Sequence, residues 1–285
     1  MSLTPNGSSL WYAATPSETW AYNNYYYMGG WMNWDPQSGD TTWGFGSVAD
    51  DTNGEGIRFR HVANDVLDPS MYVQAASGGS TAELGAADDG AYDIPENGTG
   101  VWIQWLIELR LRASLSPAWF MTARGMLYTP GGGSWLVGSA QNLDAQTDFE
   151  DISHIVFAGL SVDPTNATPG FSFMSEAKIS DLYFINNGAA AMTASQRNQL
   201  ITKIPSLVFN ADKLLGYWRC NDSLANYDDG SFGSLLLGNG GTTAYDEDEP
   251  DIQRENDDGD ASRSICGKNQ IIVPGAHLGD GILRV

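Results

Sequence analysis

The sequence predicts an all-β fold, a sandwich of the jelly-roll type built from short antiparallel strands. Apolar segments alternate with Gly-, Pro- and Asn-rich turn signals about every 8–12 residues, a spacing typical of β-sandwiches. The 285 residues include 33 Gly, 10 Trp and 12 Tyr, and 42% are hydrophobic while 17% are charged. This composition favours strands and tight turns, and it excludes a disordered chain.

The first expected strands follow from alternation along the chain. Residues 25–34, with the sequence YYYMGGWMNW, are expected to form a strand, a Gly-rich kink and a second strand. Residues 57–62 alternate apolar and basic or His side chains, which is the period of a half-buried strand. Residues 71–75 are another short strand before a turn-rich segment.

Residues 101–112 give the strongest strand pattern in the chain. In this segment we expect Leu109 and Leu111 to face the core, because side chains alternate across a strand. We expect Glu108, Arg110 and Arg112 to face outward. Further strands are expected over residues 119–124, 125–128, 134–138, 152–162, 171–174, 177–185, 214–220 and 234–237.

One segment, residues 193–204, has the pattern of a helix. Thr193 can cap it, with Gln196 three residues on as the capping-box partner. Leu200, Ile201 and Ile204 supply an apolar face until Pro205, where the helix must end.

Composition divides the chain into two parts. Residues 1–240 are expected to form the jelly-roll domain, in which residues 1–20 could serve as an N-terminal arm. Residues 241–285 are expected to form an acidic C-terminal arm. Its residues 246–260 contain nine acidic side chains, one Arg and no aromatic residue, which is the composition of a solvated segment.

The net charge narrows the class of partner. Lys and Arg number 14 against 35 Asp and Glu, which gives −21. A chain this acidic is repelled by phosphate backbones and by anionic lipid surfaces, so we expect neither nucleic acid nor a membrane as partner. The sequence shows no signal peptide and no apolar run long enough to span a bilayer. Cys220 and Cys266 lack a zinc-type spacing, and both a disulfide and two free thiols stay open.

Two segments resemble laminin-G-like (concanavalin-A-like) jelly-roll domains. In residues 176–200 the strand positions of that family are filled by Ile179, Asp181, Leu182, Tyr183 and Ile185, and the helix entry by Met192, Thr193, Gln196 and Leu200. In residues 214–240 the matching positions are Trp218, Asn221, Asp229 and Gly230. The resemblance implies a laminin-G-like jelly roll. Acidic, aromatic-rich proteins of this kind are similar to structural proteins of tailed phages and other viruses.

The expected function is therefore that of a non-enzymatic virion structural protein, a phage capsid decoration or surface protein that docks by shape complementarity. The expected partners are other virion proteins and further copies of the chain, and the expected location is the virion surface. The alternative from another class is a carbohydrate-binding, lectin-like module, for example in a tail fibre, with glycans as partners. Fold-level resemblance does not decide between them.

The candidate contact residues lie in an aromatic block. Residues 11–45 contain eleven aromatic residues and no Lys or Arg. Three interpretations stay open: the rings are core, they line a sugar site, or they form an intersubunit surface, where Tyr and Trp are enriched. The absence of any Lys or Arg before Arg58 favours the last. The six candidate contacts for a ligand or partner are Trp20, Tyr25, Tyr27, Trp31, Trp34 and Trp43.

Catalytic and metal signals are compositional only. Glu249, Asp251 and Glu255 do not keep the alternation that a glycosidase strand needs, and Pro250 interrupts them, so no catalytic residue is predicted. His61, His154 and His277 share no ligand spacing. No cofactor is expected; carboxylates suit Ca²⁺, and the weak candidate ligands are Asp246, Asp248, Asp251 and Asp257.

Overall fold

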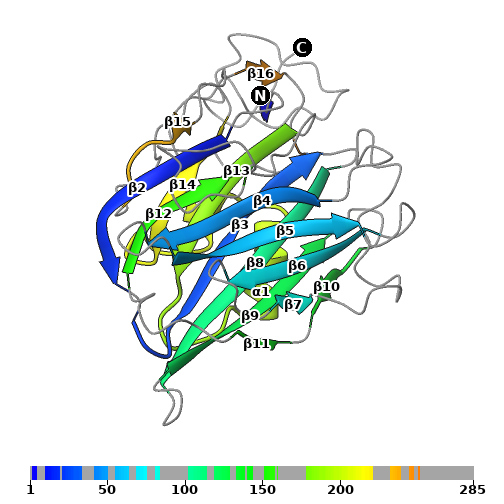
Figure 1. The fold of residues 1–285 in the computed structure, drawn as a ribbon. Coiled ribbons are helices and arrows are strands. Elements are labelled where there is room, and N and C mark those ends of the chain that lie inside the picture. The colour runs from blue at the N-terminus through cyan, green and yellow to red at the C-terminus, as the bar shows by residue number, and fades with distance from the viewer. Residues whose placement is uncertain are drawn as a thin grey trace, which may run out of the picture.

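Two antiparallel β-sheets form the molecule (Figure 1). The structure is a computed structural model, and it describes residues 2–4, 10–19, 21–33, 42–50, 55–63, 69–75, 81–83, 102–113, 119–128, 133–138, 140–143, 151–157, 159, 178–220, 232–238, 244–246 and 250. Side chains are described most fully in residues 21–33, 102–110, 122–128 and 178–220. The statements below concern these residues.

Among the described residues, one sheet has nine strands in the order β10–β9–β8–β3–β13–β1–β16, with β11 also paired to β9 and β14 to β13. Its strands are β1 (Ser2–Thr4), β3 (Tyr25–Asn33), β8 (Trp102–Ala113), β9 (Trp119–Tyr128), β10 (Trp135–Val137), β11 (Gln141–Leu143), β13 (Lys178–Asn186), β14 (Leu214–Trp218) and β16 (Ala244–Asp246). We call it the nine-stranded sheet.

The other sheet has seven described strands in the order β15–β2–β12–β4–β5–β6–β7. They are β2 (Leu10–Thr19), β4 (Thr42–Asp50), β5 (Glu55–Ala63), β6 (Pro69–Ala75), β7 (Thr81–Glu83), β12 (Asp151–Phe157) and β15 (Leu236–Gly238). The chain passes repeatedly between the sheets, so sheet neighbours such as β3 and β13 are far apart in sequence. This is the all-β jelly-roll sandwich that the sequence predicts.

The inner face of the nine-stranded sheet packs against the seven-stranded sheet. Phe157 of β12 meets Trp218 of β14 edge to face, with ring centroids 5.5 Å apart. Phe232 extends the cluster to Phe184, at 5.4 Å between centroids, and Phe184 stacks on Tyr26. These aromatic contacts make the sandwich core.

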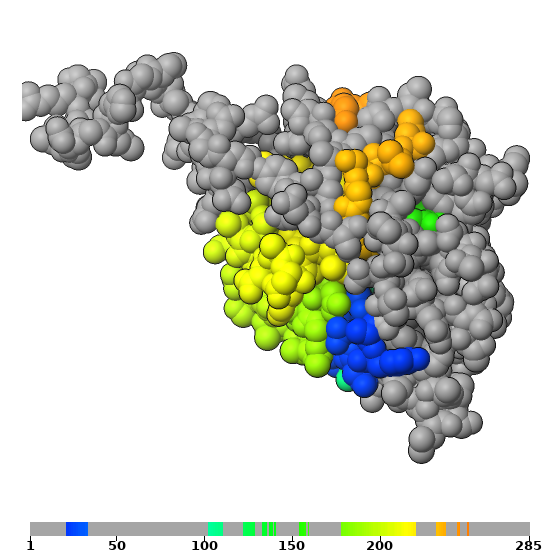
Figure 2. Space-filling view, turned by 90° about the vertical axis from the view of Figure 1, so that its left-hand side faces the viewer, coloured from blue at the N-terminus to red at the C-terminus, as the bar shows by residue number. Residues whose placement is uncertain are grey.

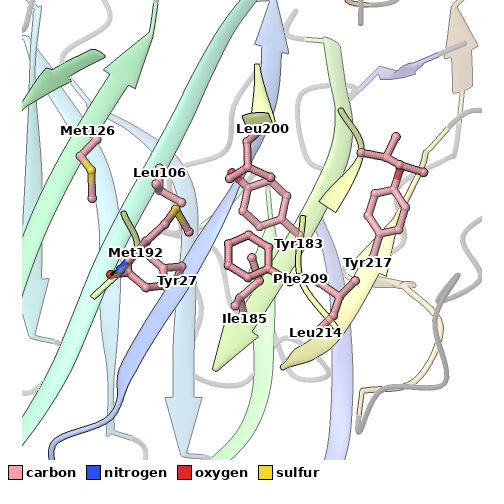
Figure 3. Packing of buried hydrophobic residues seen from close by; sticks show 11 residues of the cluster. Tyr27, Leu106, Met126, Tyr183, Ile185, Met192, Leu200, Phe209, Leu214 and Tyr217 are labelled. Carbon is pink, nitrogen blue, oxygen red and sulfur yellow. Dashed lines mark hydrogen bonds between the residues drawn. The ribbon is translucent and has the colours of Figure 1, made fainter. Parts of the chain in front are cut away.

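The outer face of the same sheet carries a second core, which we call the outer core. Its cover is the segment 187–213, which contains α1 (Ala194–Leu200) and the short 3₁₀ helix η2 (Pro205–Leu207). Figure 3 shows the packed side chains. They come from the five strands β3, β8, β9, β13 and β14 and from this cover. They are Tyr27, Leu106, Met126, Tyr183, Ile185, Met192, Leu200, Ile204, Phe209, Leu214 and Tyr217.

The predicted helix is confirmed, with its cap. Thr193 Oγ1 accepts a hydrogen bond from the Gln196 backbone N–H at 3.1 Å, and Gln196 Oε1 accepts from the Thr193 N–H at 2.9 Å. The α-helix ends at Leu200, four residues earlier than the predicted segment, and Pro205 opens η2.

The expected kink at the Gly pair of β3 is wrong, because β3 runs unbroken from Tyr25 to Asn33. The glycines allow close packing instead of a bend. A Cβ on Gly29 would lie 2.7 Å from the Tyr183 hydroxyl oxygen and from the Trp105 carbonyl oxygen, and one on Gly30 would lie 2.7 Å from a Leu182 methyl carbon. A larger residue here would separate β3 from its neighbours.

The expectation that Glu108 faces solvent is also wrong, since Glu108 is 6% exposed. Both faces of β8 are covered over residues 102–109: the seven-stranded sheet lies on one side, and the outer core with its polar margin on the other. Residues 119–128, predicted as two pieces, form the single strand β9.

The described residues near both ends of the chain are strands, and the boundaries of the expected arms stay a prediction. Residues 2–4 and 10–19, for which an N-terminal arm was open, are the strands β1 and β2. Residues 244–246, expected in the acidic arm, form β16 at the edge of the nine-stranded sheet. The expected strand at residues 171–174 lies outside the described residues.

Candidate functional site: the arginine–tyrosine rim and the buried Glu108

Two cross-strand rows on the outer face bring the polar residues together. One row places Tyr25 of β3 beside Arg110 of β8, which is beside Thr122 of β9. The next row places Tyr27 beside Glu108, and Glu108 beside Arg124. The rows lie where the cover segment begins, because Gly188 and Asn187 bond to the backbone of Tyr25.

Glu108 is the centre of a buried hydrogen-bond network. Its Oε2 accepts from the Tyr27 hydroxyl at 2.6 Å and from Arg124 Nη2 at 2.7 Å. The Tyr27 hydroxyl in turn accepts from the Met192 N–H at 2.7 Å. Arg197 of α1 donates from Nη1 to the Met192 carbonyl at 3.1 Å. The network therefore joins β9, β8 and β3 to the cover segment.

Burial determines the electrostatics of this network. Desolvation, and next the adjacent Glu108 carboxylate, hold the pKa of Tyr27 far above its ordinary value. The phenol therefore stays protonated and can donate to Glu108. A buried carboxylate is costly unless it is paired, and Arg124, whose side chain is 26% exposed, supplies the opposite charge.

Beside the network lies a half-exposed surface that we call the rim, made of Tyr25, Arg110, Arg124 and Arg197. The Arg110 guanidinium carbon sits 4.5 Å from the centroid of the Tyr25 ring, a cation–π contact. Arg110 Nε donates to the Asn23 carbonyl at 3.3 Å. The same turn carries Tyr22, which is 48% exposed.

The turn before β3 is held firmly to the body of the protein. Asn24 donates from its amide to Asn186 Oδ1 at 3.1 Å, and the Ala21 N–H donates to the Tyr26 hydroxyl at 2.9 Å. Figure 2 shows residues 21–33, in blue, side by side with the green and yellow segment 178–220 on one face of the molecule. The rim is therefore presented on a rigid frame.

A second buried carboxylate, Asp181, stabilises an irregularity in strand β13. It has φ +50°, and the register of β13 against β3 shifts between Ser180 and Tyr183. Its oxygens accept from the hydroxyls of Ser180 and Tyr217, each at 2.7 Å. These bonds hold the bulge that lies against Gly30.

Two further titratable side chains are buried nearby. Cys220 is fully buried, and its Sγ lies 3.4 Å from the Trp218 carbonyl oxygen. Burial also raises the pKa of Tyr183 far above its ordinary value. Cys266, its possible disulfide partner by sequence, lies outside the described residues.

The six aromatic candidates have different positions. Tyr27 and Trp31 are core residues, 0% and 4% exposed, so the contact prediction does not apply to these two rings. Tyr25 is half-buried and contributes to the rim. Trp43 belongs to β4, and its side chain is not among those described; Trp20 and Trp34 lie outside the described residues.

The candidate metal ligands and histidines are not brought together in the described part of the chain. No group of three or more His, Cys, Asp or Glu that could hold a metal ion occurs there. Asp246 is in β16 and His61 in β5, while His154 is buried on β12. The remaining candidates, Asp248, Glu249, Asp251, Glu255, Asp257 and His277, lie outside the described residues.

The residues that the sequence analysis did not name as site candidates are Tyr22, Glu108, Arg110, Arg124 and Arg197. Glu108 stood in an alternating strand and looked like a solvent-facing position. The signal that could have found the pair is the opposite charge of Glu108 and Arg124 in two adjacent strands, since such pairs tend to lie opposite each other.

The fold defines the class of the chain as an all-β jelly-roll sandwich. No protein-family model matches the chain, and no curated protein matches it in sequence. Among solved structures, it is similar to the native heptameric SAP-like pentraxin from Limulus polyphemus, with 12% identity over 83% of this chain and 93% of that one and a TM-score of 0.39.

Two structures of Scytalido-glutamic peptidase, with a peptide-based transition state analog and with a transition state analog inhibitor, also match. Each has 9% identity over 84% of this chain and 99% of that one, with TM-scores of 0.33 and 0.34. Likeness at this level carries no argument about function. Within the described residues, no helix is long and apolar enough to cross a membrane.

Proposed function

We propose that the chain is a non-enzymatic structural protein of a virus particle, a capsid decoration or other surface protein of a phage, which acts by docking through the rim. The observation that carries the docking step is the arrangement of Arg110 over Tyr25 beside the exposed Tyr22. Arg and Tyr are enriched in protein interfaces. The Tyr25 ring is already ordered by Arg110 and by the bonds of its backbone, so it loses little conformational entropy when a partner contacts it.

The two buried carboxylates accept hydrogen bonds from neighbouring side chains, which agrees with a structural role. Glu108 bonds to Tyr27 and Arg124, and Asp181 bonds to Ser180 and Tyr217. Each acid thus holds strands or the cover segment together. The virus particle as location comes from the laminin-G-like resemblance of residues 176–200 and 214–240, and it remains part of the proposal.

Mass spectrometry of purified particles tests this function. The proposal expects the chain at a fixed stoichiometry with a major capsid or tail protein. If particles purified from cells that produce the chain do not contain it, the proposal is contradicted. Reconstitution gives the residue-level test: Arg110→Ala should reduce binding to particles lacking the chain, whereas Lys203→Ala, which changes the same charge on the cover segment, should not.

The second candidate is a carbohydrate-binding module, favoured by the exposed Tyr22 ring beside the Asn23 side chain, which is also exposed. Flat rings stack on the apolar faces of sugars, and amides bond to hydroxyl groups. A glycan array separates the two candidates. Binding that Tyr22→Ala abolishes and Tyr245→Ala preserves would favour the lectin; Tyr245 is the matched control because it is 39% exposed on β16.

A further inference from the structure

The rim is a local concentration of positive charge on an acidic molecule. The three rim arginines, Arg110, Arg124 and Arg197, and the one acid bonded to them, Glu108 through Arg124, sum to +2 in a chain of −21. Each guanidinium uses only part of its donor set. Arg110 donates from Nε, Arg124 from Nη2 and Arg197 from Nη1. All three residues are partly exposed, so their other guanidinium N–H groups are left for an anion.

The most acidic run of the chain begins at the other end of the same sheet. Asp246 ends β16, which pairs with β1, and Leu3 of β1 pairs with Ile179 of β13. Ile179 is opposite Met32 of β3. Since Tyr25 and Met32 are seven residues apart on one strand, about 23 Å separates the rim from that end. In Figure 1, β16 lies at the end towards which β3 runs.

We propose that copies of the chain associate head to tail, with the acidic run 246–260 of one copy bound at the rim of the next. This rests on the docking function above and adds a second copy of the chain as a further partner of the same surface. A contact between two different parts of the chain, the rim of one copy and the acidic run of the next, is heterologous, and it closes into a ring or extends into a filament.

Charge arithmetic supports this choice of occupant. The run contains nine acidic residues and one Arg, giving −8. Two chains at −21 repel each other, but this long-range term is screened beyond about 8 Å at physiological salt. A direct contact between guanidinium and carboxylate groups survives screening better, and the Tyr22 and Tyr25 rings add apolar area to it.

Sedimentation of the full chain at about 50 mM and about 500 mM NaCl tests the proposal. We expect concentration-dependent association at low salt that high salt reverses. Arg110→Glu should weaken the association by about tenfold or more, because the cation that binds the acidic run is replaced by an anion that repels it. The matched control, Lys203→Glu, makes the same charge change on the cover segment outside the rim and should weaken association by less than about twofold.

A double-mutant cycle identifies the contact. Neutralising Asp251, Glu255, Asp257 and Asp258 to their amides should weaken association as much as Arg110→Glu does. The combined variant should be no weaker than the stronger single one, because both changes remove the same contact. Circular dichroism and the melting temperature confirm that each variant is folded.

Three results would overturn the proposal. The first is that Arg110→Glu and Lys203→Glu weaken association equally. The second is that the combined variant weakens association by the product of the two separate effects, which would show that the rim and the run act independently. The third is that the chain is a monomer at every concentration, so that the run has no second copy to bind. The docking function is judged separately: particles that contain the chain, together with a monomer in solution, reject only the head-to-tail contact. Association in solution without the chain in particles rejects only the particle function.

Discussion

The two faces of the nine-stranded sheet are buried in different ways. Where its side chains are described, the inner face meets another sheet through aromatic rings such as Phe184 and Trp218. The outer face is covered by the segment 187–213, and a carboxylate, Glu108, lies buried at the margin of its core. The inner face is thus packed by aromatic contacts, while the cover adds specific polar bonds to an apolar core at the place where the rim is exposed.

The largest expected effect comes from the inner face. Phe184→Ala should lower the free energy of unfolding by about 3–5 kcal/mol, because it removes a fully buried ring and leaves a cavity. Urea unfolding followed by Trp fluorescence measures it. A loss below about 1.5 kcal/mol would mean that this face is loosely packed and that the contrast between the faces is mistaken.

Unpairing the carboxylate on the outer face should have the next effect. Arg124→Met should cost about 2 kcal/mol, since Glu108 remains buried without its cation; the partial exposure of Arg124 reduces the cost below that of a fully buried pair. The double variant Glu108→Gln with Arg124→Met should recover at least half of it. If the double variant is less stable than Arg124→Met, Arg124 does not stabilise the protein by neutralising the Glu108 carboxylate.

Alkaline pH should weaken the outer face further. The pKa values of Tyr27 and Tyr183 are raised in the folded state above about 10, the unfolded value. Their contribution is therefore fully present below pH 10 and is lost as pH rises above it, by about 1.4 kcal/mol per pH unit for each group. Tyr27→Phe should reduce this slope by about half, measured by urea unfolding between about pH 9 and 11. An unchanged slope would contradict the assignment.

The smallest effect concerns the start of the cover. Thr193→Ala removes the helix cap and should cost about 1 kcal/mol. Thr202→Ala is the matched control, because its hydroxyl is exposed and makes only a 3.4 Å contact with the Gln199 carbonyl. Equal losses for the two variants in thermal unfolding would show that the capping box adds nothing specific.

The sequence predicted those features that are set locally. The alternating strands and the capped helix at Thr193 were recognisable because their signals lie within a few residues of each other.

The outer core could not be predicted, because its cover comes from a distant part of the chain. Glu108 looked solvent-facing until segment 187–213, about 80 residues later, folded over it. The run Tyr25-Tyr26-Tyr27 shows the same limit: alternation sends Tyr26 to the inner face and Tyr27 to the outer one, while Tyr25 stays half-exposed at the strand start. Gly29 and Gly30 resembled a turn because close packing needs the same residue type.

Hydrogen exchange at the Met192 amide tests the central claim, that polar bonds fasten the cover to the outer face, most directly. This N–H donates to the Tyr27 hydroxyl. In Tyr27→Phe, which keeps the ring, the Met192 amide should exchange about tenfold faster, while the Tyr183 amide within the sheet stays unchanged. A Met192 amide that is unprotected in the parent chain, or equal acceleration at both positions, would contradict the account.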